Sequence, residues 1–298
     1  MTRLADIAKA ITSKGSPIVV ATVQSKGGVG KTVYSFCSAC FAAEKLGLRV
    51  LLIDLDQNGN LTSLCMDKDD ALSMDNLSTV YRTSKTSPDF AQIKPNRIDY
   101  AEQFGVTLTS GSLDILPAAS DLTFVDNSGD IGVFQQLKAW LKTQGGKYDV
   151  IIIDNPGHLG NLTICSLVAS DFILCPLEMG EFGFQGIATI QRFLNEVNDN
   201  FRTQNPVQSI GYLPYKVDTR TKEFKRLMSL IESNNAGHLL VGDGDTFIEH
   251  RVSVAAAINS CLAPWNYSQT DKGAKEAGIN YIETLTTIYG IIAGLDNE

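Results

Sequence analysis

The chain has 298 residues, of which 44% are hydrophobic, and a formal net charge of −8 at pH 7. This hydrophobic fraction is usual for a globular protein with a substantial core. No stretch approaches the roughly 20 unbroken apolar residues of a membrane span, and the acidic balance argues against wholesale binding of polyanions. Residues 1–15 lack the apolar block and cleavage site of a secretory signal, so we expect a cytoplasmic protein.

Apolar runs and helical patterns alternate along the chain. Residues 1–16 carry apolar side chains at helical spacing and predict an N-terminal helical extension. Strand-like runs recur at 18–23, 50–53, 106–109, 114–116, 150–153, 172–175 and 209–213. Helical patterns occur at 33–46, 132–144, 161–168 and 186–200, and the polar stretch 67–96 predicts short helices and loops. The alternation predicts an α/β fold, a doubly wound, mostly parallel sheet with helices on both faces. No linker or repeat is visible, so residues 1–298 are expected to form a single domain.

A glycine-rich segment with two lysines lies between the first strand and the first long helix. It reads Lys-Gly-Gly-Val-Gly-Lys-Thr over residues 26–32. Its glycines let the backbone curl around phosphate oxygens, so that several N–H groups and a helix N-terminus face one anion. Lys31 would reach the β- and γ-phosphates, and the Thr32 hydroxyl would hold Mg²⁺. The strict phosphate-loop pattern is not met, because Ser25 stands where its first glycine should be.

This two-lysine variant resembles the deviant Walker A ATPases, the superfamily of P-loop NTPases that includes ParA, MinD and the nitrogenase iron protein. The resemblance implies that Lys26 crosses a dimer interface to the partner's nucleotide. The expected nucleotide-binding residues of the loop are Lys26, Gly27, Gly28, Val29, Gly30, Lys31, Thr32 and Val33. The implied cofactors are ATP and Mg²⁺.

Two acidic residues end the second strand, in the segment Asp-Leu-Asp-Gln-Asn-Gly-Asn over 54–60. The segment resembles the first switch of ParA-like proteins, which usually reads D-x-D-P-Q-x-N. On that match Asp56 would orient the attacking water and Asp54 would support the Mg²⁺ shell, so the expected catalytic set is Lys26, Lys31 and Asp56. The chain departs from the pattern at Gln57 and Asn58, and an alternative is that the two carboxylates cap a loop.

A third segment, 148–157, has the form of a Walker B strand followed by the second switch. Four apolar residues precede Asp154, which is expected to hold a Mg²⁺-bound water. Thr32, Asp54 and Asp154 are therefore the expected metal-site residues. Gly157 and the following turn could move when the γ-phosphate is lost.

The resemblance to ParA continues at 113–118, 170–178, 211–226 and 248–259, so that it covers roughly residues 17–290. The tetrapeptide Tyr-Lys-Val-Asp at 215–218 resembles the guanine-reading N-K-x-D, with tyrosine in place of asparagine. Because ParA relatives place their adenine pocket near this strand end, ATP is favoured over GTP. Pro214 and Asp218 are the expected nucleotide-binding residues there.

The favoured function is that of a DNA partition ATPase associated with the nucleoid. The resemblance implies an ATP-dependent homodimer that binds DNA nonspecifically and is stimulated by a ParB-like centromere-binding partner. Candidate phosphate contacts are Arg220, Lys222, Lys225, Arg226 and Arg251. The alternative for them is a solvated basic helix face.

Other members of the superfamily suggest competing functions. A MinD-like positioning ATPase needs a basic amphipathic C-terminal helix, whereas the apolar stripe at 281–295 carries no basic residue. We therefore expect a helix packed on the body, and no membrane partner. An iron-protein function would need cysteines that bridge a cluster, but most of the six lie in apolar segments and are expected to be buried thiols. A cytoplasmic protein cargo is the remaining alternative, while a tyrosine autokinase would need a C-terminal tyrosine cluster.

Overall fold

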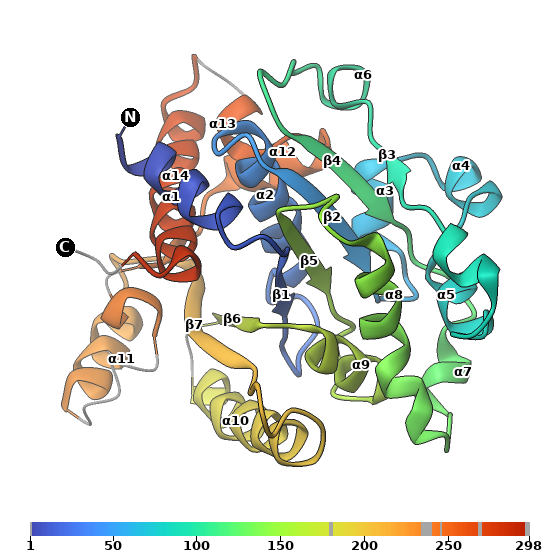
Figure 1. Ribbon diagram of the computed structural model, residues 1–298. Helices are drawn as coiled ribbons and strands as arrows, with labels where there is room; N and C mark the ends of the chain where they lie inside the picture. The colour runs from blue at the N-terminus through green and yellow to red at the C-terminus, as the bar shows by residue number, and fades with distance from the viewer. Residues whose placement is uncertain (1, 179–180, 234–239, 245, 268–269, 296–298) are drawn as a thin grey trace.

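The computed structural model describes residues 2–178, 181–233, 240–244, 246–267 and 270–295. Its centre is an eight-stranded sheet with the order β3-β4-β2-β5-β1-β6-β7-β8 (Figure 1). Every neighbouring pair is parallel except β3 and β4. The strands are β1 (Ile18–Thr22), β2 (Arg49–Asp54), β3 (Asn96–Arg97), β4 (Ser112–Leu116), β5 (Val150–Asp154), β6 (Phe172–Glu178), β7 (Gln208–Val217) and β8 (Ile248–Glu249). The predicted doubly wound, mostly parallel fold is confirmed.

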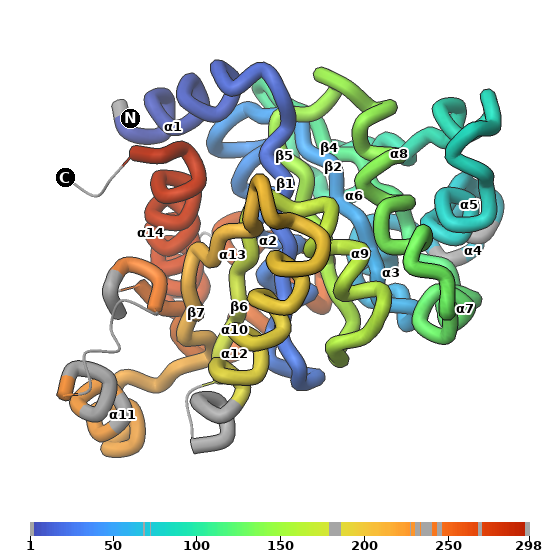
Figure 2. The backbone as a smooth tube through the Cα atoms, turned by 60° about the horizontal axis from the view of Figure 1, so that its bottom comes forward, coloured from blue at the N-terminus to red at the C-terminus, as the bar shows by residue number. Residues whose placement is uncertain are grey.

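Helices cover both faces of the sheet (Figures 1 and 2). They are α1 (Thr2–Thr12), α2 (Lys31–Glu44), α3 (Asn60–Cys65), α4 (Lys68–Ser73), α5 (Leu77–Arg82), α6 (Tyr100–Phe104), α7 (Thr123–Asp126), α8 (Gln136–Gln144), α9 (Asn161–Ala169), α10 (Glu181–Phe201), α11 (Lys222–Ser233), α12 (Val252–Asn259), α13 (Pro264–Tyr267) and α14 (Lys272–Ala293). Short 3₁₀ helices are η1 (Pro88–Gln92), η2 (Ile131–Gln135) and η4 (Val241–Gly244).

Alternate residues of the central strands pack on opposite sides, as the two-residue period of a strand requires. In β2, Val50 and Leu52 join a core with α1, α2 and α14. Leu51 and Ile53 join a second core with α8, α9 and α10. The continuous apolar runs of the sequence therefore reflect strands that are buried on both faces.

The C-terminal helix lies against the body of the protein, as its apolar stripe predicted. In α14 the side chains of Tyr281, Leu285, Ile288 and Ile292 are buried, and the Tyr289 hydroxyl hydrogen-bonds with the Ser38 side chain of α2 at 3.0 Å. In the described part of the chain, no helix combines the length and the apolar character that crossing a bilayer requires.

Three expectations about local structure were wrong or incomplete. Residues 106–109 form no strand, because this stretch connects α6 to β4 between two glycines with left-handed backbone, Gly105 and Gly111. The strands β3 and β8 have two residues each, which is too short for a periodic pattern. The helix expected at 132–144 begins as η2 and becomes α8 only at Gln136.

The cysteines are free thiols, and five of the six are buried; Cys261 is half-buried. Cys37 and Cys40 lie inside α2, where burial raises the pKa of both thiols. The expectation of buried thiols therefore holds for five of them.

Candidate nucleotide site

Three predicted segments meet where β1, β2 and β5 end. Asp54 of β2 and Thr22 of β1 both lie level with Asp154 of the intervening β5. The glycine-rich loop follows β1 and leads directly into α2 at Lys31. In open α/β sheets, ligands bind in the crevice beyond the carboxyl ends of the strands, which is where these side chains gather.

The loop has the backbone of an anion cradle. Gly28 and Gly30 have φ angles of 79° and 94°, a left-handed conformation that glycine adopts at little cost. Gly30 is the N-cap of α2, so the unpaired N–H groups of the first helical turn point toward the loop. The Lys31 ammonium donates to the carbonyl oxygen of Lys26 at 3.1 Å, and burial lowers its pKa although Asp154 and Asp56 oppose that shift. A desolvated cation beside free N–H groups is a site for phosphate.

Two buried carboxylates lie beside this cradle. Asp154 accepts from the Thr32 hydroxyl at 2.7 Å and from the Ser35 hydroxyl at 3.0 Å. Asp54 accepts from the backbone N–H and the hydroxyl of Thr62, each at 2.8 Å. Burial raises the pKa of Asp154 to about 6, and burial together with the charge of Asp154 raises that of Asp54 to about 7.

These groups fit Mg²⁺ by their chemistry. Hydroxyl and carboxylate oxygens are hard donors, and Mg²⁺ usually takes one or two of them together with water and substrate phosphates. Among the residues that the structure describes, no group of three His, Cys, Asp or Glu side chains could hold a metal by itself. Thr32 would contact the ion directly, and Asp154 would hold Thr32 and a water.

A cavity of about 520 Å³ opens over the loop. Gly27, Gly28, Gly30, Lys31, Thr32, Val33, Asp56 and Gly157 are among its lining residues. Asp56 is half-buried, and its Oδ1 accepts from the Asn58 backbone at 3.0 Å and from the Asn58 side chain at 2.8 Å. The structure therefore brings the loop, both predicted switches and Asp56 around one cavity.

A smaller cavity of about 290 Å³ adjoins the first and shares Val33, Lys216 and Ile258 with it. Lys216 has a left-handed backbone with φ 55°, and its ammonium donates to the carbonyl oxygen of Gly28 at 3.2 Å. Sequence reasoning noticed the tetrapeptide 215–218 but assigned no role to Lys216. Its contact with the loop joins positions 188 residues apart, and no local pattern reveals such a contact.

The two residues expected on the nucleotide-base side line neither cavity. Pro214 is paired with Leu177 inside the sheet. Asp218 accepts from the Arg220 guanidinium through both carboxylate oxygens, at 2.8 Å each. The hydrogen bonds from Arg220 lower the pKa of Asp218 to about 2. Their assignment to the nucleotide stays a prediction.

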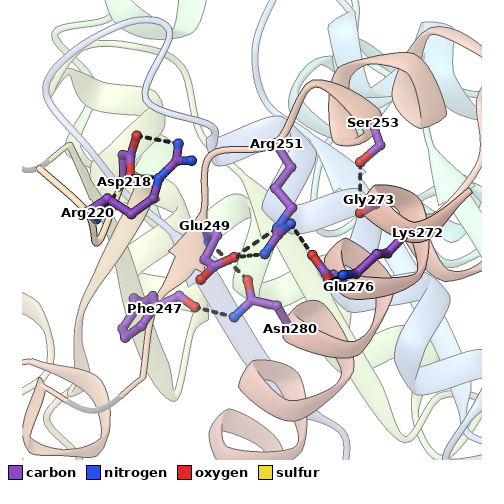
Figure 3. A network of polar contacts seen from close by, with 10 residues as sticks. All are labelled: Asp218, Arg220, Phe247, Glu249, Arg251, Ser253, Lys272, Gly273, Glu276 and Asn280. Atoms are coloured by element: carbon purple, nitrogen blue, oxygen red, sulfur yellow. Dashed lines mark hydrogen bonds and ion pairs between the residues drawn. The ribbon is translucent and has the colours of Figure 1, made fainter.

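The candidate DNA contacts fall into two groups. Arg220 and the α11 residues Lys222, Lys225 and Arg226 are exposed, and α11 lies at the margin of the molecule (Figure 1). Arg251 instead bonds to two carboxylates, those of Glu249 and Glu276 (Figure 3). The charge of Arg251 is therefore compensated locally, as is that of Arg220 by Asp218. The charges of Lys222, Lys225 and Arg226 on α11 face solvent.

The sheet order, the glycine-rich loop before α2 and the paired acidic residues define the protein as a P-loop NTPase of the deviant Walker A class. A family described as "AAA domain" matches residues 18–207. The sporulation initiation inhibitor protein Soj of Bacillus subtilis is 32% identical over 207 residues, which are 68% of this chain and 74% of Soj. The chain therefore belongs to the ParA/Soj family of ATPases, as its sequence predicted.

Two solved structures resemble the fold. Cobyrinic acid a,c-diamide synthase of Mycobacterium smegmatis, solved with a bound ATP analogue and magnesium, is 28% identical with a TM-score of 0.59, over 73% of this chain and 82% of that one. A variant of McdA from Cyanothece, solved in complex with ATP, has a TM-score of 0.70 at 16% identity, over 95% of this chain and 98% of that one. The predicted cofactors, ATP and Mg²⁺, are thus found in relatives of this fold.

Replacement of Gly30 by alanine is expected to distort the loop. A Cβ at Gly30 would lie 2.1 Å from a ring carbon of Tyr215, and the backbone there is left-handed. Such strain costs about 1–3 kcal/mol, so urea unfolding should show a lower midpoint for Gly30→Ala. Gly27→Ala is the matched control, because no atom lies within 4 Å of the added Cβ. Equal midpoints for the two variants would contradict the contact.

Proposed function

We propose that the protein binds and hydrolyses Mg²⁺–ATP and uses this cycle to partition DNA. The observation that carries the proposal is the convergence of Lys31, Thr32 and Asp56 on one cavity at a helix N-terminus. Asp154 is buried behind them and accepts a hydrogen bond from the Thr32 hydroxyl. A phosphate chain in this cavity would meet the loop N–H groups and the Lys31 ammonium. The smaller cavity beside Lys216 has room for the base.

The residues support an in-line attack of water on the γ-phosphorus. Lys31 neutralises charge on the β- and γ-phosphates, and the loop N–H groups hold them in place. Asp56 lies at the cavity wall and would orient the attacking water. Mg²⁺, when bound, supplies charge compensation across the phosphates. Asp154 accepts a hydrogen bond from the Thr32 hydroxyl and so fixes the position of this hydroxyl, which would hold such an ion.

The active form proposed is a homodimer assembled around ATP. The side chain of Lys26 is exposed, while its carbonyl oxygen accepts from Lys31. The loop therefore carries one exposed and one buried lysine side chain. This arrangement supports the expectation that Lys26 acts on the nucleotide of the partner subunit.

Lys26→Ala should leave nucleotide binding by the monomer nearly unchanged and should weaken the ATP-dependent dimer, because the charge that it removes serves the other subunit. Sedimentation velocity with and without ATP measures the dimer, and titration measures the affinity. Lys142→Ala, a substitution of an exposed lysine on α8, is the control. A normal ATP dimer with normal turnover in Lys26→Ala would refute the role in trans.

DNA is the proposed cargo, and α11 is the proposed contact surface. Three exposed basic residues, Lys222, Lys225 and Arg226, lie within the first five residues of this helix. Dimerisation would place two copies of the helix in one assembly. The negative net charge of the protein does not prevent local phosphate contacts, because those depend on the charges nearby. A ParB-like partner would then supply sequence recognition and stimulate hydrolysis, and the complex would associate with the cytoplasmic nucleoid.

Binding to any duplex should require ATP and weaken steeply with salt, as counterion release demands. Arg220→Ala combined with Lys222→Ala should lower the salt slope by about one unit for each lost phosphate contact and leave ATP affinity unchanged. Arg49→Ala combined with Lys147→Ala serves as control. This pair removes the same charge from the side of the sheet where β2 and β5 begin, away from α11. If ATP-bound wild-type protein retards no duplex at low salt, the cargo is a protein instead.

A further inference from the structure

A further cavity, of about 440 Å³, lies at the edge of the sheet opposite to the nucleotide site. It opens where the parallel strands β6 and β7 begin, whereas the nucleotide site lies beyond the ends of β1, β2 and β5. Helix α8, the last residue of α9 and the segment after α10 complete its walls. The lining residues of this basal cavity are Lys138, Ala169, Asp171, Phe172, Arg202, Asn205, Pro206 and Gln208. None of them lines the two cavities of the nucleotide site.

A buried arginine lines the basal cavity. Arg202 is only 7% exposed. Its Nη1 atom donates to the carbonyl oxygens of Val168 and Ser170, at 2.8 and 2.6 Å, and its Nε atom donates to that of Asn205 at 2.7 Å. In the part of the chain that the structure describes, Nη2 makes no hydrogen bond and the guanidinium forms no ion pair. The N–H groups of Nη2 are therefore left for a ligand in the cavity.

A second cation lines the same cavity. Lys138 of α8 is half-buried, and its ammonium makes no hydrogen bond or ion pair with the described residues. Burial and the neighbouring charges of Arg202 and Lys142 lower the pKa of Lys138, while Asp171 opposes that shift. Burial also lowers the pKa of Arg202. An anion between two such cations would relieve both their desolvation and their mutual repulsion.

The one carboxylate of the lining does not neutralise these cations. The Oδ2 atom of Asp171 accepts from the backbone N–H of Val19 at 2.9 Å, and within the described ranges no ion pair joins Asp171 to Arg202 or Lys138. Three basic residues, Arg202, Lys138 and Lys142, stand against the single Asp171 and leave a formal charge of +2. A phosphate monoester carries a charge of about −1.5 to −2 at pH 7, which would balance this excess.

We propose that the basal cavity binds the phosphate group of a small phosphomonoester between Arg202 and Lys138. Charge-assisted hydrogen bonds from arginine and lysine are well suited to phosphate oxygens. The volume of about 440 Å³ exceeds that of a phosphate group and lies within the roughly 300–1,000 Å³ of small-molecule sites. The rest of the ligand would contact the half-buried Phe172 ring and the exposed amide side chains of Asn205 and Gln208.

A small ligand fits this cavity better than a nucleic acid does. The phosphates of a duplex lie on a convex surface and reach exposed cations more readily than an enclosed one. Arg202 is enclosed, in contrast to the exposed basic residues of α11. The basal cavity is therefore distinct in position and in chemistry from the proposed DNA contact surface.

The test measures ligand binding to the full-length Lys31→Ala protein, in which the nucleotide cavity has lost its phosphate-binding lysine. Titration calorimetry at constant ionic strength uses inorganic phosphate, glycerol 3-phosphate and glycerol. Lys138→Ala is added to Lys31→Ala to remove one cation of the basal cavity. Lys142→Ala is the matched control, because Lys142 is exposed, lies one turn later on α8 and is outside the lining. The same titrations on proteins with Lys31 intact, saturated with Mg²⁺–ADP, replace this series if Lys31→Ala does not fold.

Inorganic phosphate and glycerol 3-phosphate should both bind, and glycerol should not. Lys138→Ala should lower both affinities about 10-fold or more, the effect of one charge-assisted hydrogen bond. Lys142→Ala should lower them by less than about threefold, because its exposed charge is screened. Absence of binding up to about 10 mM ligand, or equal losses in the two variants, overturns the proposal. A short duplex that displaces phosphate and requires Lys138 would assign the cavity to DNA and would also overturn it.

Discussion

Lys31→Ala is expected to abolish ATP binding at ordinary nucleotide concentrations. The substitution removes the buried cation that the structure places at the floor of the phosphate cavity. Charge-assisted hydrogen bonds contribute roughly 1.5–3 kcal/mol each, and Lys31 would make more than one to the phosphates. Affinity should therefore fall by on the order of 100-fold or more. Equilibrium titration with ATP in the presence of Mg²⁺ measures the change.

The control for this experiment is Lys147→Ala, which removes an exposed lysine remote from the cavity. Circular dichroism of both variants should match that of the wild type, because Lys31 contributes a hydrogen bond to the loop and not to the core. An unchanged ATP affinity in a folded Lys31→Ala protein would refute the phosphate-loop assignment.

Asp56→Ala is expected to separate binding from hydrolysis. Asp56 lines the phosphate cavity but makes no hydrogen bond to Lys31 or Thr32, so ATP and Mg²⁺ should still bind. Loss of a group that positions the reacting water lowers turnover by about 100- to 10,000-fold. The ATP-bound dimer should then accumulate, which sedimentation and a phosphate-release assay can follow together.

Asp67→Ala is a suitable control, since Asp67 is an exposed aspartate whose side chain makes no capping bond to α4. Turnover of Asp56→Ala at the wild-type rate would show that another group orients the water. The segment around Gln57 and Asn58 would be the first place to look for it, because it departs from the pattern of the family there.

The sequence predicted the sheet and the phosphate side of the site because their signals are local. A buried strand, a glycine turn and a helix start follow one another within about 30 residues around Gly30, and Asp54 and Asp154 each end an apolar run. The expectation of a strand at 106–109 was wrong because it rested on apolar character alone. These residues lie between two glycines with left-handed backbone, Gly105 and Gly111, and form no strand.

The sequence also did not reveal which atoms the charged side chains contact. Arg251 was a candidate phosphate contact, yet one of its two carboxylate partners, Glu276, lies 25 residues further along the chain. The Lys216 ammonium donates to the carbonyl oxygen of Gly28, which is 188 residues away in the sequence. In both cases the residue type was visible, whereas the atom that it contacts depends on how separate segments pack.

The sheet ends in two-residue strands on both sides, β3 at one edge and β8 at the other. Long unpaired edges invite intermolecular strand addition and aggregation, and short edges discourage it. In the described part of the protein, the backbone therefore offers little template for fibre-like growth by sheet extension. Association of copies would then be left to side-chain surfaces, such as the proposed one around Lys26. Contacts of that kind could be broken and remade in every nucleotide cycle, whereas a continuous intermolecular sheet would tend to lock the subunits together.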